Sequence, residues 1–324
     1  MQDPWLERWH GPLADRPEAL AALMRLRWAV GSAPLMARHP DLGFQVLDDA
    51  WCAEALDADL PLFERWASEL AMGENPLSPS VLHPGDQLLG KHFEALIACW
   101  LEASPHFKLH AHSVQLHEGG QTVGELDFLV EDLRHGRSLH LEVASKFYLA
   151  AEDHSGWDEW VGPSGRHDTL RVKMDKLVHQ LAAARRPSAR EYLSSHRIAT
   201  PQSVLLMKGW FFRHYTHIHK GKSPRWAHPD HAAGWWCRPS EAHQVMGSDH
   251  VRILPLPKGR WLGRFHPTQG DPPLHWSRLE QVLDDHFSRT RRALMCAVVI
   301  EGAAGWEEIS RGFVVHPDWP NTGR

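Results

Sequence analysis

Residues 124–149, GELDFLVEDLRHGRSLHLEVASKFYL, place two carboxylates and a lysine within an apolar segment. The pattern predicts two strands joined at 134–137. Because successive side chains of a strand point to opposite faces, Asp127, Glu142 and Lys146 would share one face. The opposite face would be apolar and would consist of Leu126, Phe128, Val130, Leu139, Leu141, Val143, Phe147 and Leu149.

The position of the turn decides which charged side chains oppose each other. A turn centred on 134–135 pairs Asp127 with Glu142, whereas a turn centred on 136–137 pairs Asp127 with Lys146. Opposed side chains have Cβ atoms about 4.5–5.5 Å apart, and like charges at that distance destabilise the sheet. A divalent metal with oxygen ligands would relieve this repulsion, and Lys146 would hold an anion or activate water. The alternative is a solvated strand face with a Glu142–Lys146 ion pair.

The helices predicted before and after this hairpin carry further candidates. Glu94 lies beside the apolar stripe of the first helix, which would begin after Asp86 as its N-cap, and is a candidate third ligand. On the second helix, predicted over 167–185, Lys173, Lys176 and Gln180 share one face, a spacing that suits a phosphate backbone. Taken singly, each group is more often part of a solvated helix flank than of a functional site.

Other segments must position this hairpin. Apolar spacing and first-turn prolines predict helices over 17–30 and 61–71, and a loop follows at 75–85. A strand at 107–117, a GGQ turn at 119–121 and a buried strand at 201–212 complete the central region. The last part alternates strands at 251–257 and 293–301 with a helix around 276–288. Three antiparallel strands between two helices, followed by a strand, predict an α/β fold with a central mixed sheet flanked by helices.

Composition limits the classes of protein. The 324 residues are 43% hydrophobic and 23% charged, as in ordinary globular proteins, and no apolar run reaches the roughly 18 residues of a membrane span. The N-terminal segment lacks the basic start and apolar stretch of a signal peptide, so we expect a cytoplasmic protein that does not enter membranes. The formal net charge of −5 gives no overall attraction to nucleic acid, but 166–190 contains seven Arg or Lys residues and predicts a local basic face.

The combination of an acid on a helix, an Asp and then a Glu and a Lys on neighbouring strands, and a basic helix with a Gln resembles the PD-(D/E)XK nuclease superfamily. Several strings are more similar still to an uncharacterised bacterial family, the domain of unknown function 1853, over about residue 85 to beyond 260. They are LGKHFEALI (89–97), GELDFLV (124–130), LHLEVASKFYL (139–149), GPSGRHDTLRVKMDKLVHQL (162–181), LMKGWFF (206–212) and GWW (234–236).

This resemblance implies cleavage of phosphodiester bonds of DNA or RNA with Mg²⁺ or Mn²⁺. The catalytic residues that it implies are Asp127, Glu142, Lys146 and Glu94, of which the three acids would bind the metal. Lys173, Lys176 and Gln180 would contact nucleic acid. The superfamily pattern places its lysine two residues after the acid, where this chain has Ala144. Lys146 lies two residues further along, which returns it to the same strand face.

The resemblance also implies a domain organisation. A restriction-endonuclease-like core would span 85–214, with a helical N-terminal extension at 1–84 and an α+β C-terminal extension of the same domain at 215–324. A second hypothesis for function is a nucleic-acid-binding module that has lost catalysis. A third is an enzyme of another class or a protein-interaction module, because a fold does not fix a function.

Overall fold

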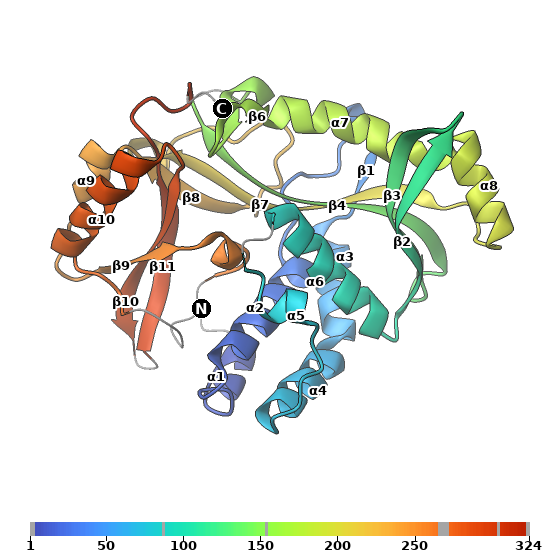
Figure 1. The fold of residues 1–324 in the computed structure, drawn as a ribbon, viewed down its shortest axis with the longest axis horizontal. Coiled ribbons are helices and arrows are strands. Elements are labelled where there is room, and N and C mark those ends of the chain that lie inside the picture. Colours follow the sequence, from blue (N-terminus) through green and yellow to red (C-terminus); the bar gives the residue numbers. More distant parts are fainter. Residues whose placement is uncertain (1–3, 86–87, 153–154, 265–271, 303–304, 322–324) are drawn as a thin grey trace.

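The structure is a computed structural model that describes residues 4–85, 88–152, 155–264, 272–302 and 305–321 (Figure 1). In this part of the chain, eleven strands form one sheet with the order β2-β3-β4-β7-β8-β11-β10-β9; β1 pairs with β7, and β5 and β6 extend from β4. Neighbours β2, β3 and β4 are antiparallel, whereas β4, β7 and β8 are parallel. The predicted central mixed sheet is therefore confirmed.

The strands run as follows: β1 (Gln45–Val46), β2 (Phe107–Glu118), β3 (Gln121–Asp132), β4 (Arg137–Ala150), β5 (Trp160–Gly162), β6 (Gly165–Thr169), β7 (Gln202–His214), β8 (Ala232–Cys237), β9 (Arg252–Leu256), β10 (Leu294–Gly302) and β11 (Gly305–Val314). The helices are α1 (Pro4–His10), α2 (Pro17–Gly31), α3 (Asp49–Ala58), α4 (Leu60–Ala71), α5 (Pro79–Leu82), α6 (Leu89–Ala103), α7 (Leu170–Ala182), α8 (Pro187–Ser195), α9 (Ala242–Met246) and α10 (Trp276–Arg289).

Helices cover both faces of the central strands. Helices α2, α3 and α6 lie on one side of β4, and α7 crosses the other side (Figure 1). The alternation along β4 explains this arrangement, because Leu141 and Val143 pack in the cluster that contains α2 and α6. Ala144 and Tyr148 pack instead with the buried stripe of α7, which consists of Leu170, Met174, Leu177 and Leu181. The two-faced hairpin predicted from the sequence thus places a helix layer on each side.

Three sequence predictions need correction. The loop predicted at 75–85 contains the short helix α5. The helix predicted from residue 167 begins at Leu170, because 165–169 forms β6 and the Thr169 hydroxyl accepts the Val172 N–H at 3.2 Å as an N-cap. Leu126, predicted to lie with Phe128, packs instead with Leu129 in a cluster beside α8. The predicted cap Asp86 lies outside the described residues.

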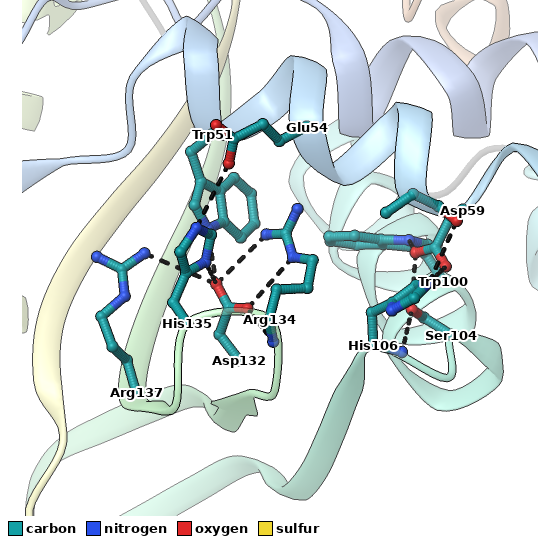
Figure 2. Close-up of polar contacts among 11 residues, drawn as sticks. Trp51, Glu54, Asp59, Trp100, Ser104, His106, Asp132, Arg134, His135 and Arg137 are labelled. Atoms are coloured by element: carbon teal, nitrogen blue, oxygen red, sulfur yellow. Dashed lines mark hydrogen bonds and ion pairs between the residues drawn. The ribbon is translucent and has the colours of Figure 1, made fainter.

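Two buried carboxylates join the helical layer to the β2–β3–β4 hairpins (Figure 2). Asp132, at the end of β3, accepts a hydrogen bond from Trp51 Nε1 of α3 at 2.9 Å. Asp59, between α3 and α4, accepts hydrogen bonds from Trp100 Nε1 and Ser104 Oγ, both at 2.7 Å. Because a buried carboxylate is stable only when it is hydrogen-bonded, the Asp132 contact fixes α3 to the end of β3, and the Asp59 contacts fix the α3–α4 junction to the end of α6.

Gly209 fixes the spacing between β4 and β7. It pairs with Lys146 in an unbroken parallel register that runs from Leu139↔Gln202 to Leu149↔Phe212. Its φ is 149°, and an added Cβ would overlap the carbonyl oxygen of Lys146. Glycine at this position allows β4 to continue without a bulge, so Glu142, Ala144 and Lys146 keep one face.

We expect Gly209→Ala to lower the free energy of unfolding by about 2 kcal/mol or more, because the backbone of Lys146 must move to admit the methyl group. Gly90→Ala is the matched control, since Gly90 lies in α6 and a Cβ there meets no atom within 4 Å. Urea unfolding followed by circular dichroism measures both variants. Equal stability of Gly209→Ala and wild type would show that the two strands are not held this closely.

Candidate active site

Strands β3 and β4 form a fork at the predicted acids. They pair from Asp132↔Arg137 to Phe128↔Leu141, the register expected for a turn centred on 134–135. Beyond that point β3 stays paired with β2, and β4 stays paired with β7. Strand β3 separates from one edge of β4. Along that same edge, the next backbone pairing is that of Leu149 with β5. The side chain of Asp127 bridges the start of the fork, because its Oδ2 accepts the Val143 N–H at 3.0 Å.

Glu142 and Asp127 form an acid pair at this fork, in which Glu142 is buried and Asp127 is half-buried. Glu142 is 1% exposed, and among the described residues its Oε2 has no hydrogen-bond donor. Burial, together with the charge of Asp127, raises the pKa of Glu142 to about 8. Burial also raises the pKa of Asp127 to about 6, against the effect of the Val143 N–H, and nearby Glu94 and Glu125 add to the increase. Both acids therefore hold their protons more tightly than free carboxylic acids do.

Helix α7 brings its lysines to this pair. Lys173 Nζ lies 4.0 Å from Glu142 Oε1, with only 12% of the side chain exposed, and burial lowers the pKa of Lys173. Gln180 Oε1 accepts a hydrogen bond from Lys173 Nζ at 3.4 Å. Lys176 is exposed and close enough to Glu142 for its charge to lower the pKa of that acid. The three predicted nucleic-acid contacts thus lie together beside Glu142.

Lys146 lies on the predicted face but has a partner that the sequence reasoning missed. Its Nζ donates hydrogen bonds to both carboxylate oxygens of Asp168, at 2.9 and 3.1 Å. Asp168 belongs to β6, which reaches this position through β5 and the far end of β4. In the sequence, Asp168 is an acid within the basic segment 166–190, and no local pattern links it to Lys146. The two lysines are neighbours, because the charge of Lys146 lowers the pKa of Lys173.

Glu94 approaches the acid pair from α6. It raises the pKa of Asp127, so it lies within electrostatic reach, and its Oε2 is 2.6 Å from Lys91 Nζ. In the described part of the chain, no group of three or more His, Cys, Asp or Glu side chains is arranged to hold a metal ion. A metal at this position would have Asp127 and Glu142 as its protein ligands. Two carboxylates completed by water and substrate phosphate are the usual protein environment of Mg²⁺.

The carboxylate oxygens of Asp127 and Glu142 are ligand atoms that fit a hard divalent cation. A buried and a half-buried carboxylate with raised pKa values are costly to ionise without positive charge, and Glu142 Oε2 has no donor among the described residues. The lysines on α7 compensate in part, but the 4.0 Å separation of Lys173 from Glu142 is longer than a charge-assisted hydrogen bond.

The chain matches the model of a known protein family. The family model described as Domain of unknown function (DUF1853) matches residues 24–315. The chain belongs to this family. The matched range includes every candidate site residue from Glu94 to Gln180. Neither the curated proteins nor the solved structures give a match to the chain.

No helix in the described ranges is long and apolar enough to cross a membrane, so no α-helical span is found among these residues of the DUF1853 protein.

We expect Glu142→Gln to stabilise the metal-free protein by about 1–3 kcal/mol at pH 8 and by less at pH 5. The folded-state pKa of Glu142 is about 8, above its ordinary value of 4.5, so the folded protein holds a proton that the unfolded chain has lost. Stability is therefore lost as pH rises through this window. Glutamine carries no charge, so the variant does not have the free-energy cost of ionising a buried acid at high pH. Thermal melts of wild type and Glu142→Gln in EDTA, at both pH values, measure this difference in stability.

The same melts with Mn²⁺ test the ligand role. Wild type should gain stability with metal, because a ligand that binds only the folded state stabilises it, and Glu142→Gln should gain less. Glu280→Gln, an exposed acid on α10, is the control and should behave as wild type. A structural ion pair between Lys173 and Glu142 predicts the opposite: Glu142→Gln would melt lower at pH 8 and wild type would not respond to Mn²⁺.

Proposed function

We propose that this DUF1853 protein is a metal-dependent nuclease of the PD-(D/E)XK, restriction-endonuclease-like type, which hydrolyses phosphodiester bonds of DNA or RNA. The observation that carries the proposal is the acid pair of half-buried Asp127 and buried Glu142 at the β3–β4 fork, facing lysines of α7. The element order α6, β2, β3, β4, α7, β7, with β4 and β7 parallel, supports the same assignment.

Asp127 and Glu142 would hold Mg²⁺ or Mn²⁺, with Glu94 as an auxiliary ligand directly or through water. The bound metal would polarise the scissile phosphate and lower the pKa of a water molecule. Asp127 is oriented for this role by the Val143 N–H, which occupies its Oδ2. Glu142 is oriented by burial between β3 and α7, and its Oε2 remains available.

The lysines supply positive charge where negative charge develops during phosphodiester cleavage. Lys173 is nearest to the acid pair, and its burial strengthens its electrostatic effect because little water screens it. Lys146 is held by Asp168 beside Lys173, so it would position the attacking water or the phosphate at a fixed place. Lys176 and Gln180 extend the same flank of α7 and would contact the flanking backbone.

A specific observation favours a second function, an inactive nucleic-acid-binding module. Ala144 occupies the lysine position of the superfamily pattern, and both oxygens of Asp168 neutralise the displaced Lys146. In this alternative, the lysines of α7 bind a phosphate backbone without cleavage.

For the nuclease, we expect Mg²⁺- or Mn²⁺-dependent cleavage of at least one of four labelled substrates, single- and double-stranded DNA and RNA. Glu142→Gln should lower the rate by about 100-fold or more, because charge stabilisation at the phosphate is lost. Lys173→Met should lower kcat more than Lys146→Met, because Lys173 lies nearer to the acid pair. Cleavage that persists in EDTA or in Glu142→Gln would exclude this site. Binding of Mn²⁺ and nucleic acid without cleavage would favour the inactive module.

For nucleic-acid binding, we expect Lys176→Gln to weaken affinity for unrelated sequences alike and to reduce the slope of log K against log salt by about 1, since one fewer counterion is released. The double variant Lys173→Ala, Lys176→Ala should show a larger reduction. Fluorescence anisotropy from 50 to 300 mM salt measures the slope. Lys258→Gln, on the exposed η6 turn (Lys258–Arg260), is the charge-matched control. An unchanged slope in both lysine variants would place the nucleic acid elsewhere.

A further inference from the structure

A cavity of about 710 Å³ lies on the flank of α7 that does not carry the candidate active site. We call it the α7-flank cavity. Successive residues of an α-helix are 100° apart, so Val178 and Ala182 lie on the opposite side of the buried stripe from Lys173 and Lys176. Arg185 follows in the 3-10 turn η3 (Ala183–Arg185). Val178, Ala182 and Arg185 line the cavity, and the first residues of β7 with the chain around β1 form its other walls. Its volume is within the range of ligand sites, about 300–1,000 Å³.

The charge of the α7-flank cavity is positive. Arg38 and Arg185 both line it, both are exposed, and neither forms an ion pair within the described residues. Among the described residues that line it there is no aspartate or glutamate. A neighbouring hollow of about 260 Å³ shares Arg38 but is also lined by Asp48 and Glu54, so it is less suited to an anion. Two guanidinium groups without carboxylate partners indicate a ligand with phosphate or carboxylate groups.

The remaining lining provides contacts for a planar polar ring. Phe44 contributes a half-buried aromatic side chain. Gln45 and Gln202 are joined by a hydrogen bond from the amide of Gln202 to the carbonyl of Gln45. Among the described residues, this leaves the NH₂ of Gln45 and the carbonyl oxygen of Gln202 without other partners. A donor and an acceptor side by side, next to an aromatic ring, are the groups that recognise the edge and the face of a nucleobase.

We propose that the α7-flank cavity binds a nucleotide, with its phosphate on Arg38 and Arg185 and its base against Phe44, Gln45 and Gln202. The nucleotide is either free or the terminal unit of a strand. This inference goes beyond the proposed nuclease and does not depend on it, because none of these residues belongs to the acid pair or to the lysine flank of α7. A side-chain contact links the cavity lining to β4, because Ser203 Oγ lies 3.1 Å from His140 Nδ1.

Isothermal titration of the full-length protein with AMP in EDTA tests the proposal. Arg38→Gln and Arg185→Gln should each weaken AMP binding by about 10-fold or more, because each removes a charge-assisted hydrogen bond. Arg190→Gln is the control, since Arg190 is exposed on α8 and does not line the cavity. Phe44→Leu should weaken AMP but leave inorganic phosphate unaffected. Glu142→Gln should bind AMP as wild type does, which separates this site from the proposed nuclease.

The source of the nucleotide is resolved by comparing AMP with a 5′-phosphorylated tetra-adenylate. Equal affinity identifies a free nucleotide, and tetra-adenylate binding at least 10-fold tighter identifies the end of a strand. The proposal is overturned if AMP does not bind at millimolar concentration, if both arginine variants bind AMP as wild type does, or if inorganic phosphate binds as tightly as AMP.

Discussion

A buried and a half-buried carboxylate that lie close together at a fork in the sheet are the constraint on which the rest of this structure depends. Like charges at neighbouring positions destabilise a sheet, and burial of Glu142 adds to that cost. Strand β3 leaves β4 at this point, and the Asp127 side chain takes the place of a backbone acceptor for Val143. The surrounding elements supply the positive charge and the rigid walls that make such a pair sustainable.

Lysines from three different elements supply this positive charge, and their acidic partners differ. Lys91 on α6 is engaged by Glu94, and Lys146 on β4 is engaged by Asp168. Lys173 alone faces Glu142 among the ion pairs of the described residues, from a largely buried position on α7. Lys91 and Lys146 therefore hold neighbouring acids in place, whereas Lys173 faces the acid pair. This division also explains why an additional cation between Asp127 and Glu142 is compatible with the arrangement.

Helix α7 separates two polar surfaces with one apolar stripe. Leu170, Met174, Leu177 and Leu181 fix the helix on β4 and β7, so its two flanks have fixed positions relative to the sheet. One flank borders the acid pair, and the other borders the α7-flank cavity. On the first flank the lysines face carboxylates, whereas Arg38 and Arg185 of the second form no ion pair among the described residues. A chain with a net charge of −5 therefore carries basic side chains on both sides of one helix, and we propose a phosphate-bearing ligand for each.

The sequence by itself determined the local geometry. Period-two alternation predicted that Asp127, Glu142 and Lys146 share a face, the helical stripes predicted the layers, and quoted strings predicted the DUF1853 family. It left the register open between an Asp127–Glu142 and an Asp127–Lys146 pairing, because both turns keep the same faces. Tertiary structure selected the first of these registers and opened the fork, which moved Leu126 into the cluster beside α8.

Only tertiary structure decided which residues meet across long separations. Lys146 meets Asp168 because β5 and β6 return to the end of β4, and Lys173 meets Glu142 because α7 packs over β4. The α7-flank cavity joins Arg38, Arg185 and Gln202 from three distant segments. Spacing along the chain carries no signal for these contacts. Residues far apart in sequence come together through strand pairing and helix packing, whereas the alternation of one strand or the stripe of one helix is fixed by the backbone geometry of that segment alone.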